Sequence, residues 1–327
     1  MEFQVKVLFL TFVLTVVFSL IIIPILRKLK VGQMERDDGP ESHLKKQGTP
    51  TMGGIIIILS MIVMCVFLYI YYTKIRIENS IAQNIIPLLL AAAGFGVIGF
   101  IDDFKKLVLK NTKGISPMAK MIGLLIISVG YSLYLTKVLN IGTDIVIPFF
   151  KTSITLPIWI YIPFAIFVML GTTNAINLTD GVDGLSSSVT TIILTCLTVI
   201  AIIFDIKEVT LFGSALSGAC LGFLLFNLYP SKVMMGDTGS LMLGGAVAAM
   251  ALYLKIPLLL IIIAIIPILE TLSVMLQVAY FKKTGNRIFK MAPLHHHFEL
   301  SGWRENKVVS VFSIITLIVC VIGLFSI

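Results

Sequence analysis

Five aspartates stand in short polar stretches of a chain that is otherwise strongly apolar. They are Asp102 and Asp103 in IGFIDDFKK (98–106), Asp180 and Asp183 in NAINLTDGVDGL (174–185), and Asp237 in MMGDTGS (234–240). A carboxylate at the centre of a membrane helix costs about 2.5–3.5 kcal/mol on insertion scales. One aspartate at a helix end could be a boundary residue, but five of them favour convergence on one site that binds a hard cation or moves a proton.

Spacing and neighbouring residues suggest different tasks for these carboxylates. Adjacent helical residues point about 100° apart, so Asp102 and Asp103 cannot do the same job. Asn177, Asp180 and Asp183 recur every third residue, and side chains at that spacing can face one ligand. Capping of a helix by Asp183 is the structural alternative.

Two further motifs favour phosphate chemistry. Asp237 follows Gly236 at a predicted helix start, where backbone N–H groups attract anions and a carboxylate could hold a hard cation. His295, His296 and His297 are consecutive, so their side chains diverge and a shared zinc ion is improbable. Contacts from imidazoles to a diphosphate fit this run better.

A basic stretch precedes the second apolar run. It is RDDGPESHLKKQGTPTMGG (36–54), in which Lys45 or Lys46 could bind phosphate. Contact with lipid headgroups is the alternative for a lysine at a membrane edge. Glu270 lies inside an apolar run and is left outside the predicted site, because it could equally mark a kinked or a shorter helix.

The elements that must position these residues are membrane helices. The chain has 327 residues, 57% of them hydrophobic and 13% charged, with a mean hydropathy of +1.02. Soluble domains carry about 25% charged residues. Composition therefore predicts an all-α integral membrane protein, a single polytopic domain over 1–327. The net charge of +8 is explained by membrane topology, and we expect no nucleic-acid partner.

About twenty apolar residues span a bilayer, and about ten runs meet this need. They are 7–26, 52–72, 85–101, 121–136, 157–176, 185–204, 209–229, 240–254, 256–281 and 308–327. The connections on one side carry 18 of the 25 Lys and Arg residues, which predicts that this side is cytoplasmic and that both termini are outside. All five aspartates then lie at the cytoplasmic face.

Taken together, the motifs resemble those of the bacterial phospho-MurNAc-pentapeptide transferases, within the polyprenyl-phosphate N-acetylhexosamine-1-phosphate transferase superfamily. The resemblance covers nearly the whole chain and rests on GTPTMGG (48–54), IDD (101–103), NLTDGVDGL (177–185), FN (226–227), MGD (235–237) and PLHHHFE (293–299). The histidine motif separates this family from relatives that make other polyprenyl-linked sugars, which remain the alternative within the enzyme class.

The resemblance implies a reaction and a set of site residues. UDP-MurNAc-pentapeptide and undecaprenyl phosphate would give lipid I and UMP, with Mg²⁺ required, in the bacterial cytoplasmic membrane. Asp237 is implied as the magnesium ligand and Asp102, Asp103 and Asp180 as catalytic. Residues implied to line the substrate site are Lys46, Asn177, Asp183, Asn227 and His295–His297.

Two mechanisms and one rival class stay open from the sequence. Asp102 is our candidate for the base that deprotonates the lipid phosphate, and a covalent aspartyl-phosphate route is the alternative. An ion-coupled transporter would use similar carboxylates, but its sites usually lie near the bilayer midplane. The sequence leaves a homodimer open.

Overall fold

The computed structural model describes residues 2–29, 48–107, 109, 114–150 and 152–327. The elements, in chain order, are α1 (Phe3–Lys28), α3 (Gly54–Ile70), η1 (Tyr71–Ile75), α4 (Asn79–Leu107), α5 (Pro117–Leu133), η2 (Tyr134–Val138), β1 (Asp144–Ile147), β2 (Thr152–Thr155), α6 (Ile158–Thr179), α7 (Leu185–Ile203), α8 (Lys207–Asn227), α9 (Gly236–Tyr253), η3 (Pro257–Leu259), α10 (Leu260–Ile263), α11 (Ile265–Thr284), α12 (Leu294–Glu299) and α13 (Glu305–Phe325). The two strands form one antiparallel hairpin.

The fold is an all-α bundle of membrane helices, as the composition predicts. Nine helices within the described part of the chain are long and apolar enough to cross a bilayer. Their outward faces carry large exposed apolar side chains such as Leu20, Ile126 and Phe167. Surface of this kind is stable against lipid rather than against water. The chain is therefore a multi-pass membrane protein.

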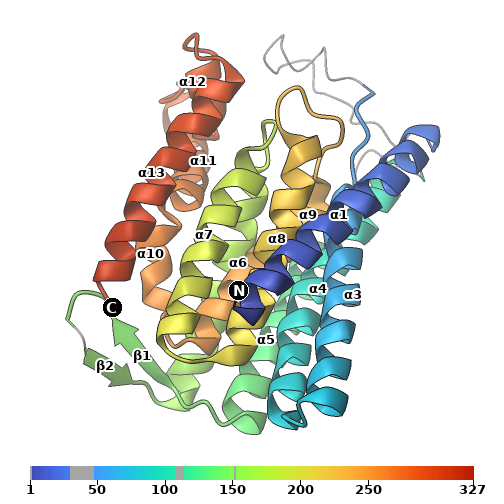
Figure 1. Ribbon diagram of the computed structural model, residues 1–327. Helices are drawn as coiled ribbons and strands as arrows, with labels where there is room; N and C mark the ends of the chain where they lie inside the picture. The colour runs from blue at the N-terminus through green and yellow to red at the C-terminus, as the bar shows by residue number, and fades with distance from the viewer. Residues whose placement is uncertain (1, 30–47, 108, 110–113, 151) are drawn as a thin grey trace.

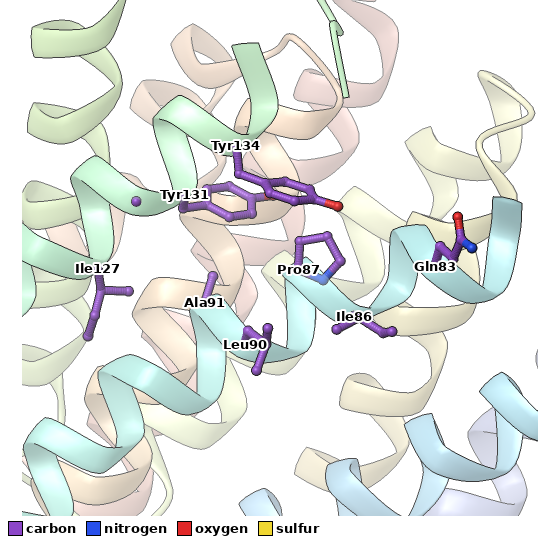
Figure 2. A pocket seen from close by; sticks show the side chains of 9 residues that line it. Gln83, Ile86, Pro87, Leu90, Ala91, Ile127, Tyr131 and Tyr134 are labelled. Carbon is purple, nitrogen blue, oxygen red and sulfur yellow. The ribbon is translucent and has the colours of Figure 1, made fainter. Parts of the chain in front are cut away.

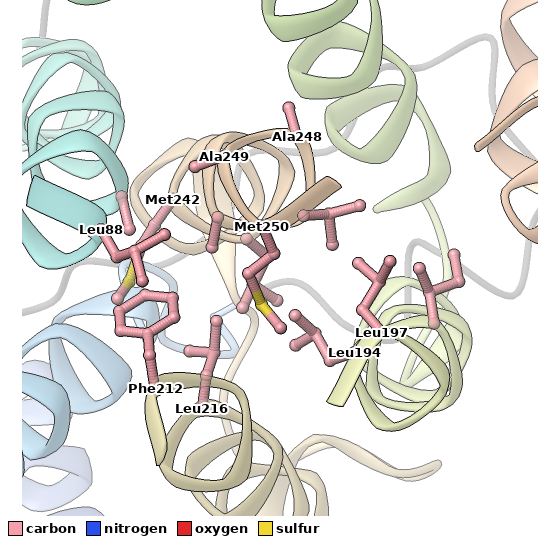
Figure 3. Packing of buried hydrophobic residues seen from close by; sticks show 14 of the residues in the cluster. Leu88, Leu194, Leu197, Phe212, Leu216, Met242, Ala248, Ala249 and Met250 are labelled. Atoms are coloured by element: carbon pink, nitrogen blue, oxygen red, sulfur yellow. The ribbon is translucent and has the colours of Figure 1, made fainter. Parts of the chain in front are cut away.

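The one predicted span that is not among these nine helices, 240–254, corresponds to α9, which lies in the interior of the bundle. Every α9 residue from Thr238 to Tyr253 is buried, and the helix packs against α3, α4, α6, α7 and α8. Its polar first turn lowers its mean hydropathy below that of the other spans. Figure 3 shows Met250 of α9 between Phe212 and Leu216 of α8 and the leucines of α7. This central packing determines where the start of α9 lies.

Close approach of α4 to the start of α9 depends on a residue without a side chain. A Cβ atom at Gly99 would collide with the backbone carbonyl of Asp237, and one at Gly54 would collide with the backbone of Gly239. The backbones of α3 and α4 therefore touch the first turn of α9. This contact brings the end of α4 beside Asp237.

Two predicted boundaries were wrong in ways that matter for the site. The run predicted as 85–101 continues as helix to Leu107, so Asp102 and Asp103 lie in the last turns of α4. The run predicted as 256–281 is not one helix, because the backbone leaves helical geometry at Ala264, between α10 and α11. Glu270 lies in the second turn of α11.

The C-terminus lies beside the β1–β2 hairpin, away from α12 (Figure 1). The ring of Phe3 stacks on Tyr71 at the end of α3, and the N–H of Phe149, beside the β1–β2 hairpin, donates to the carbonyl of Ser326. We call this the hairpin end. The opposite end, where α4 and α6 finish and α9 begins, is the site end.

We predict that the site end faces the cytoplasm and the hairpin end faces outward. A cysteine in place of Asn286 at the site end should react with a membrane-impermeant maleimide only from the cytoplasmic side, and one in place of Lys74 only from outside. Both positions are exposed, and the four native cysteines are buried and should label weakly. Labelling of both substitutions from one side would contradict this topology.

Candidate active site

The site end brings together side chains from three helices that are far apart in sequence. Asp102 and Asp103 come from the end of α4, Asn177 from the last turn of α6, and Asp237 from the first turn of α9. Asp180 follows α6 directly. The convergence expected for these residues is therefore found in the structure.

Asp103 binds the start of α9. Its carboxylate accepts the backbone N–H groups of Asp237, at 3.3 Å, and Thr238, at 2.9 Å. The hydroxyl of Thr238 also donates to it, at 2.6 Å. The first N–H groups of a helix have no partner within the helix, so a buried carboxylate here both satisfies them and complements the helix dipole. Asp103 therefore joins α4 to α9.

Asp102 points to a different group, as the angular argument predicts. One oxygen accepts the N–H of Ile115 at 2.7 Å, and the other lies 2.6 Å from Nζ of Lys106 and 4.0 Å from Nζ of Lys120. Its side chain is only 4% exposed. Both oxygens are engaged, so Asp102 holds the segment before α5 and gathers two ammonium groups.

The side chain of Asp237 is 20% exposed, compared with 4% for Asp102. Its Oδ2 lies 2.9 Å from Nζ of Lys120 and 3.3 Å from Nζ of Lys106. Its Oδ1 accepts from the amide of Asn177 at 2.8 Å, and that amide also donates to the hydroxyl of Ser240. The carboxylate of Asp237 therefore already binds two positive groups, the ammonium groups of Lys106 and Lys120.

Asp180 is half-buried beside this group. Removal from water is the main cause that raises the pKa of Asp180 to about 8, and the carboxylates of Asp237 and Asp103 add to it. A hydrogen bond from the N–H of Gly236 opposes the shift. A carboxyl group in this state accepts a proton near neutral pH unless a cation neutralises its surroundings.

A hard divalent cation fits this set of donors. Magnesium binds one or two carboxylates and completes its shell with phosphate and water oxygens. Asp237 offers such a carboxylate, with its Oδ2 on lysine ammonium groups that a cation could displace. Among the described residues, no three or more His, Cys, Asp or Glu side chains form a preformed metal cluster. A cation bound to Asp237 would therefore take its remaining ligands from phosphate and water oxygens.

Asp183 and Asn227 are nearly inaccessible. Asp183 accepts the N–H of Ser231 at 2.9 Å, and Asn227 donates to the carbonyl of Val233 at 2.9 Å and accepts from the hydroxyl of Ser187. Both side chains therefore shape the connection between α8 and α9. Their direct contact with substrate stays a prediction.

The three histidines have three different environments. His295 is 1% exposed and lies beside Glu270 and Gly181. His296 is partly exposed, with Nδ1 2.9 Å from Glu299. Nδ1 of His297 accepts the N–H of Lys290 at 3.1 Å. The ring of His295 lies against the loop that carries Asp180, and the three imidazoles have different partners.

One predicted site residue is not among those described, and one cavity lies away from the carboxylates. Lys46 lies outside the described residues. A cavity of about 430 Å³ opens between α4 and α5, lined by residues such as Gln83, Leu90 and Tyr131 (Figure 2). Ala91, the lining residue nearest the site along α4, is eleven residues before Asp102, roughly 16 Å along the helix axis. This apolar cavity is separate from the carboxylates.

Comparison with known proteins agrees with the site motifs. Residues 85–255 match the model of glycosyl transferase family 4, and residues 46–58 match a phospho-N-acetylmuramoyl-pentapeptide-transferase signature. A phospho-N-acetylmuramoyl-pentapeptide-transferase of Acetivibrio thermocellus is 46% identical over 99% of this chain and 95% of its own length. One of Clostridium perfringens strain 13 is 50% identical over 97% of this chain and 96% of its own.

The chain belongs to the phospho-N-acetylmuramoyl-pentapeptide-transferase family. It is therefore a phosphosugar transferase by family, and the resemblance seen in the motifs is confirmed. The glycosyl transferase match spans the carboxylates from Asp102 to Asp237, and the transferase signature covers the segment that leads into α3.

Sequence reasoning missed some polar residues at this family's site. Ser240 shares the amide of Asn177 with Asp237, and Glu270 lies against His295. A serine one turn into an apolar helix gives little signal. Glu270 gave a clear sequence signal, because an ionisable residue inside a membrane segment is a candidate functional residue and is expected to have a polar partner.

We predict that Asp180→Asn stabilises the protein in the absence of divalent cations. The carboxyl pKa is about 4 when unfolded and about 8 when folded, so stability falls as pH rises from 4 to 8 and the penalty stays complete above 8. The variant should melt a few degrees higher than wild type at pH 8.5 in EDTA and nearly equally at pH 4. Equal melting at pH 8.5 would contradict the raised pKa.

Proposed function

We propose that the protein transfers phospho-MurNAc-pentapeptide from UDP-MurNAc-pentapeptide to undecaprenyl phosphate, giving lipid I and UMP. The observation that carries the proposal is the grouping of carboxylates and lysines at one end of the bundle, in a chain that is 46% and 50% identical to relatives named for this activity. The reaction would take place at the cytoplasmic face of the bacterial cytoplasmic membrane.

The reaction joins anionic partners, so its barrier is largely electrostatic. A phosphate oxygen of the lipid attacks the sugar-linked phosphorus, and the bond from that phosphorus to the UMP oxygen breaks. Mg²⁺ would neutralise charge on the diphosphate, with Asp237 as its protein ligand. Lys106 and Lys120, which Asp102 and Asp237 hold in place, would face the phosphates once the cation takes Asp237.

The surroundings of Asp102 favour a positioning role over that of a base. Its oxygens already bind the N–H of Ile115 and the ammonium of Lys106, and its side chain is nearly inaccessible. A base or a nucleophile needs an oxygen free to reach the reacting group. The second proton of a phosphate monoester leaves near pH 6, so a dedicated base is needed less at neutral pH.

The transporter alternative is less well supported by the same geometry. The carboxylates gather where α4 and α6 end and α9 begins, at one end of the bundle. Substrate sites of secondary transporters lie near the midplane on broken helices. The described interruption at Ala264 lies between α10 and α11 and carries none of these carboxylates.

We expect Asp237→Asn to lose nearly all turnover while the protein still folds. The amide keeps the shape of the side chain but removes the charge that would hold the cation. The measurement is UMP release by purified protein with both substrates over a range of Mg²⁺ concentrations, together with the melting temperature. Wild-type dependence on Mg²⁺ in this variant would contradict the assignment. The absence of UMP release by the wild type would contradict the proposed function itself.

Asp102→Asn should reduce kcat by a constant factor, on the order of 100-fold, between pH 6 and pH 9. The reason is that the variant loses the charge that positions the ammonium groups of Lys106 and Lys120, and this loss of positioning is the same at every pH in the range. Rates are compared with wild type at each pH under saturating Mg²⁺. A loss that shrinks as the pH rises would instead support the base role, because deprotonated lipid phosphate would then need no help.

A further inference from the structure

A fully buried carboxylate in α11 has no part in the mechanism above. Glu270 is 0% exposed, in the second turn of α11. An ionised carboxylate is costly to remove from water unless it is paired and hydrogen-bonded. The groups that contact the Glu270 carboxylate should therefore indicate its role.

Among the described residues, the Glu270 carboxylate contacts two parts of one residue, His295. The backbone N–H of His295 donates to Oε1 at 3.2 Å and approaches Oε2 at 3.4 Å. Nδ1 of the same ring lies 3.2 Å from Oε1, at ion-pair distance. His295 is the second residue of α12, so the carboxylate also satisfies a free N–H at the start of that helix. Glu270 thus holds both the backbone and the ring of His295.

The far edge of the ring faces the loop that carries Asp180. A Cβ atom at Gly181 would collide with Nε2 of His295, so the ring lies directly against this glycine. The ring is 1% exposed, and neither of its nitrogens meets hydrogen-bond geometry with a described residue. A buried Nε2 without a hydrogen-bond partner among the described residues, packed against Gly181, is a polar group that could bind a ligand.

We propose that Glu270 is a positioning residue that acts through His295. It turns the ring so that Nδ1 faces the carboxylate and Nε2 faces the substrate phosphates beside Asp180. A carboxylate on one imidazole nitrogen orients the ring and determines which nitrogen carries the proton. His296 also has a carboxylate on Nδ1, that of Glu299, whereas Nδ1 of His297 accepts the N–H of Lys290. The ring of His295 is the one packed directly against Gly181. The inference rests on the proposed transferase function.

A double-mutant cycle tests this proposal in the full-length protein. The variants are Glu270→Gln, His295→Ala and the two combined, with kcat and KM for UMP release and the melting temperature measured for each. Glu208→Gln is the matched control, since Glu208 is a half-buried carboxylate bonded to Tyr253 at the hairpin end. The control reports the effect of losing such a carboxylate away from the site, and its kcat should stay within twofold of wild type.

Glu270→Gln alone should lower kcat about 10- to 100-fold, as loss of an orienting partner does. In the His295→Ala background it should change kcat less than twofold, because there is no ring left to orient. His295→Ala should lower the melting temperature, because the buried carboxylate loses the imidazole and keeps only the backbone N–H of residue 295, and adding Glu270→Gln should recover part of that loss.

Two results would overturn the proposal. One is a kcat for Glu270→Gln within twofold of wild type, and the other is an equal kcat loss from Glu270→Gln with and without His295. If the wild type released no UMP, the proposed function would fail separately. The melting temperatures would then decide whether the two residues act as a pair, and additive shifts would show that they do not.

Discussion

The capping of α9 by Asp103 is the interaction on which the rest of the site depends. α9 is buried along almost its whole length, so the N–H groups of its first turn cannot rely on water. The carboxylate of Asp103 accepts two of them together with the hydroxyl of Thr238. This bond is possible because Gly99 lets α4 touch the backbone of Asp237. One contact thereby satisfies a buried helix end and places Asp237 beside the α4 carboxylates.

Charge balance is the second constraint at this end of the molecule. Asp102, Asp103, Asp180 and Asp237 gather where only Lys106 and Lys120 are seen to oppose them. Among the described residues, therefore, the cluster has fewer positive than negative groups. Removal from water is the main cause of the raised pKa of Asp180, and the neighbouring carboxylates of Asp237 and Asp103 add to it. A divalent cation would remove the excess, and the lysines would then be available to substrate phosphates. The same imbalance that destabilises this group of carboxylates would favour a cation together with an anionic substrate.

Polar side chains outside the cluster of Asp102, Asp103, Asp180 and Asp237 hold the loops of the site in place. Asp183 and Asn227 bind the connection between α8 and α9, while Glu270 holds α12 through His295. In lipid, loops cannot rely on water at every depth, so buried side chains must satisfy their backbone groups. Several polar residues in the shared motifs thus have an evident structural task. The transferase chemistry needs those loops in one position, which links the two tasks.

The sequence by itself determined the membrane class, the position of nearly every span and the set of motifs, because hydropathy and residue type are local properties. It also determined that Asp102 and Asp103 face different groups, since helix geometry requires it. The pairing of Asp103 with α9 and of Glu270 with His295 was decided only by the tertiary structure. The paired residues are 135 and 25 positions apart, and no local pattern specifies which helix ends meet. The break at Ala264 was equally hidden, because an apolar run has the same hydropathy whether its helix continues or stops.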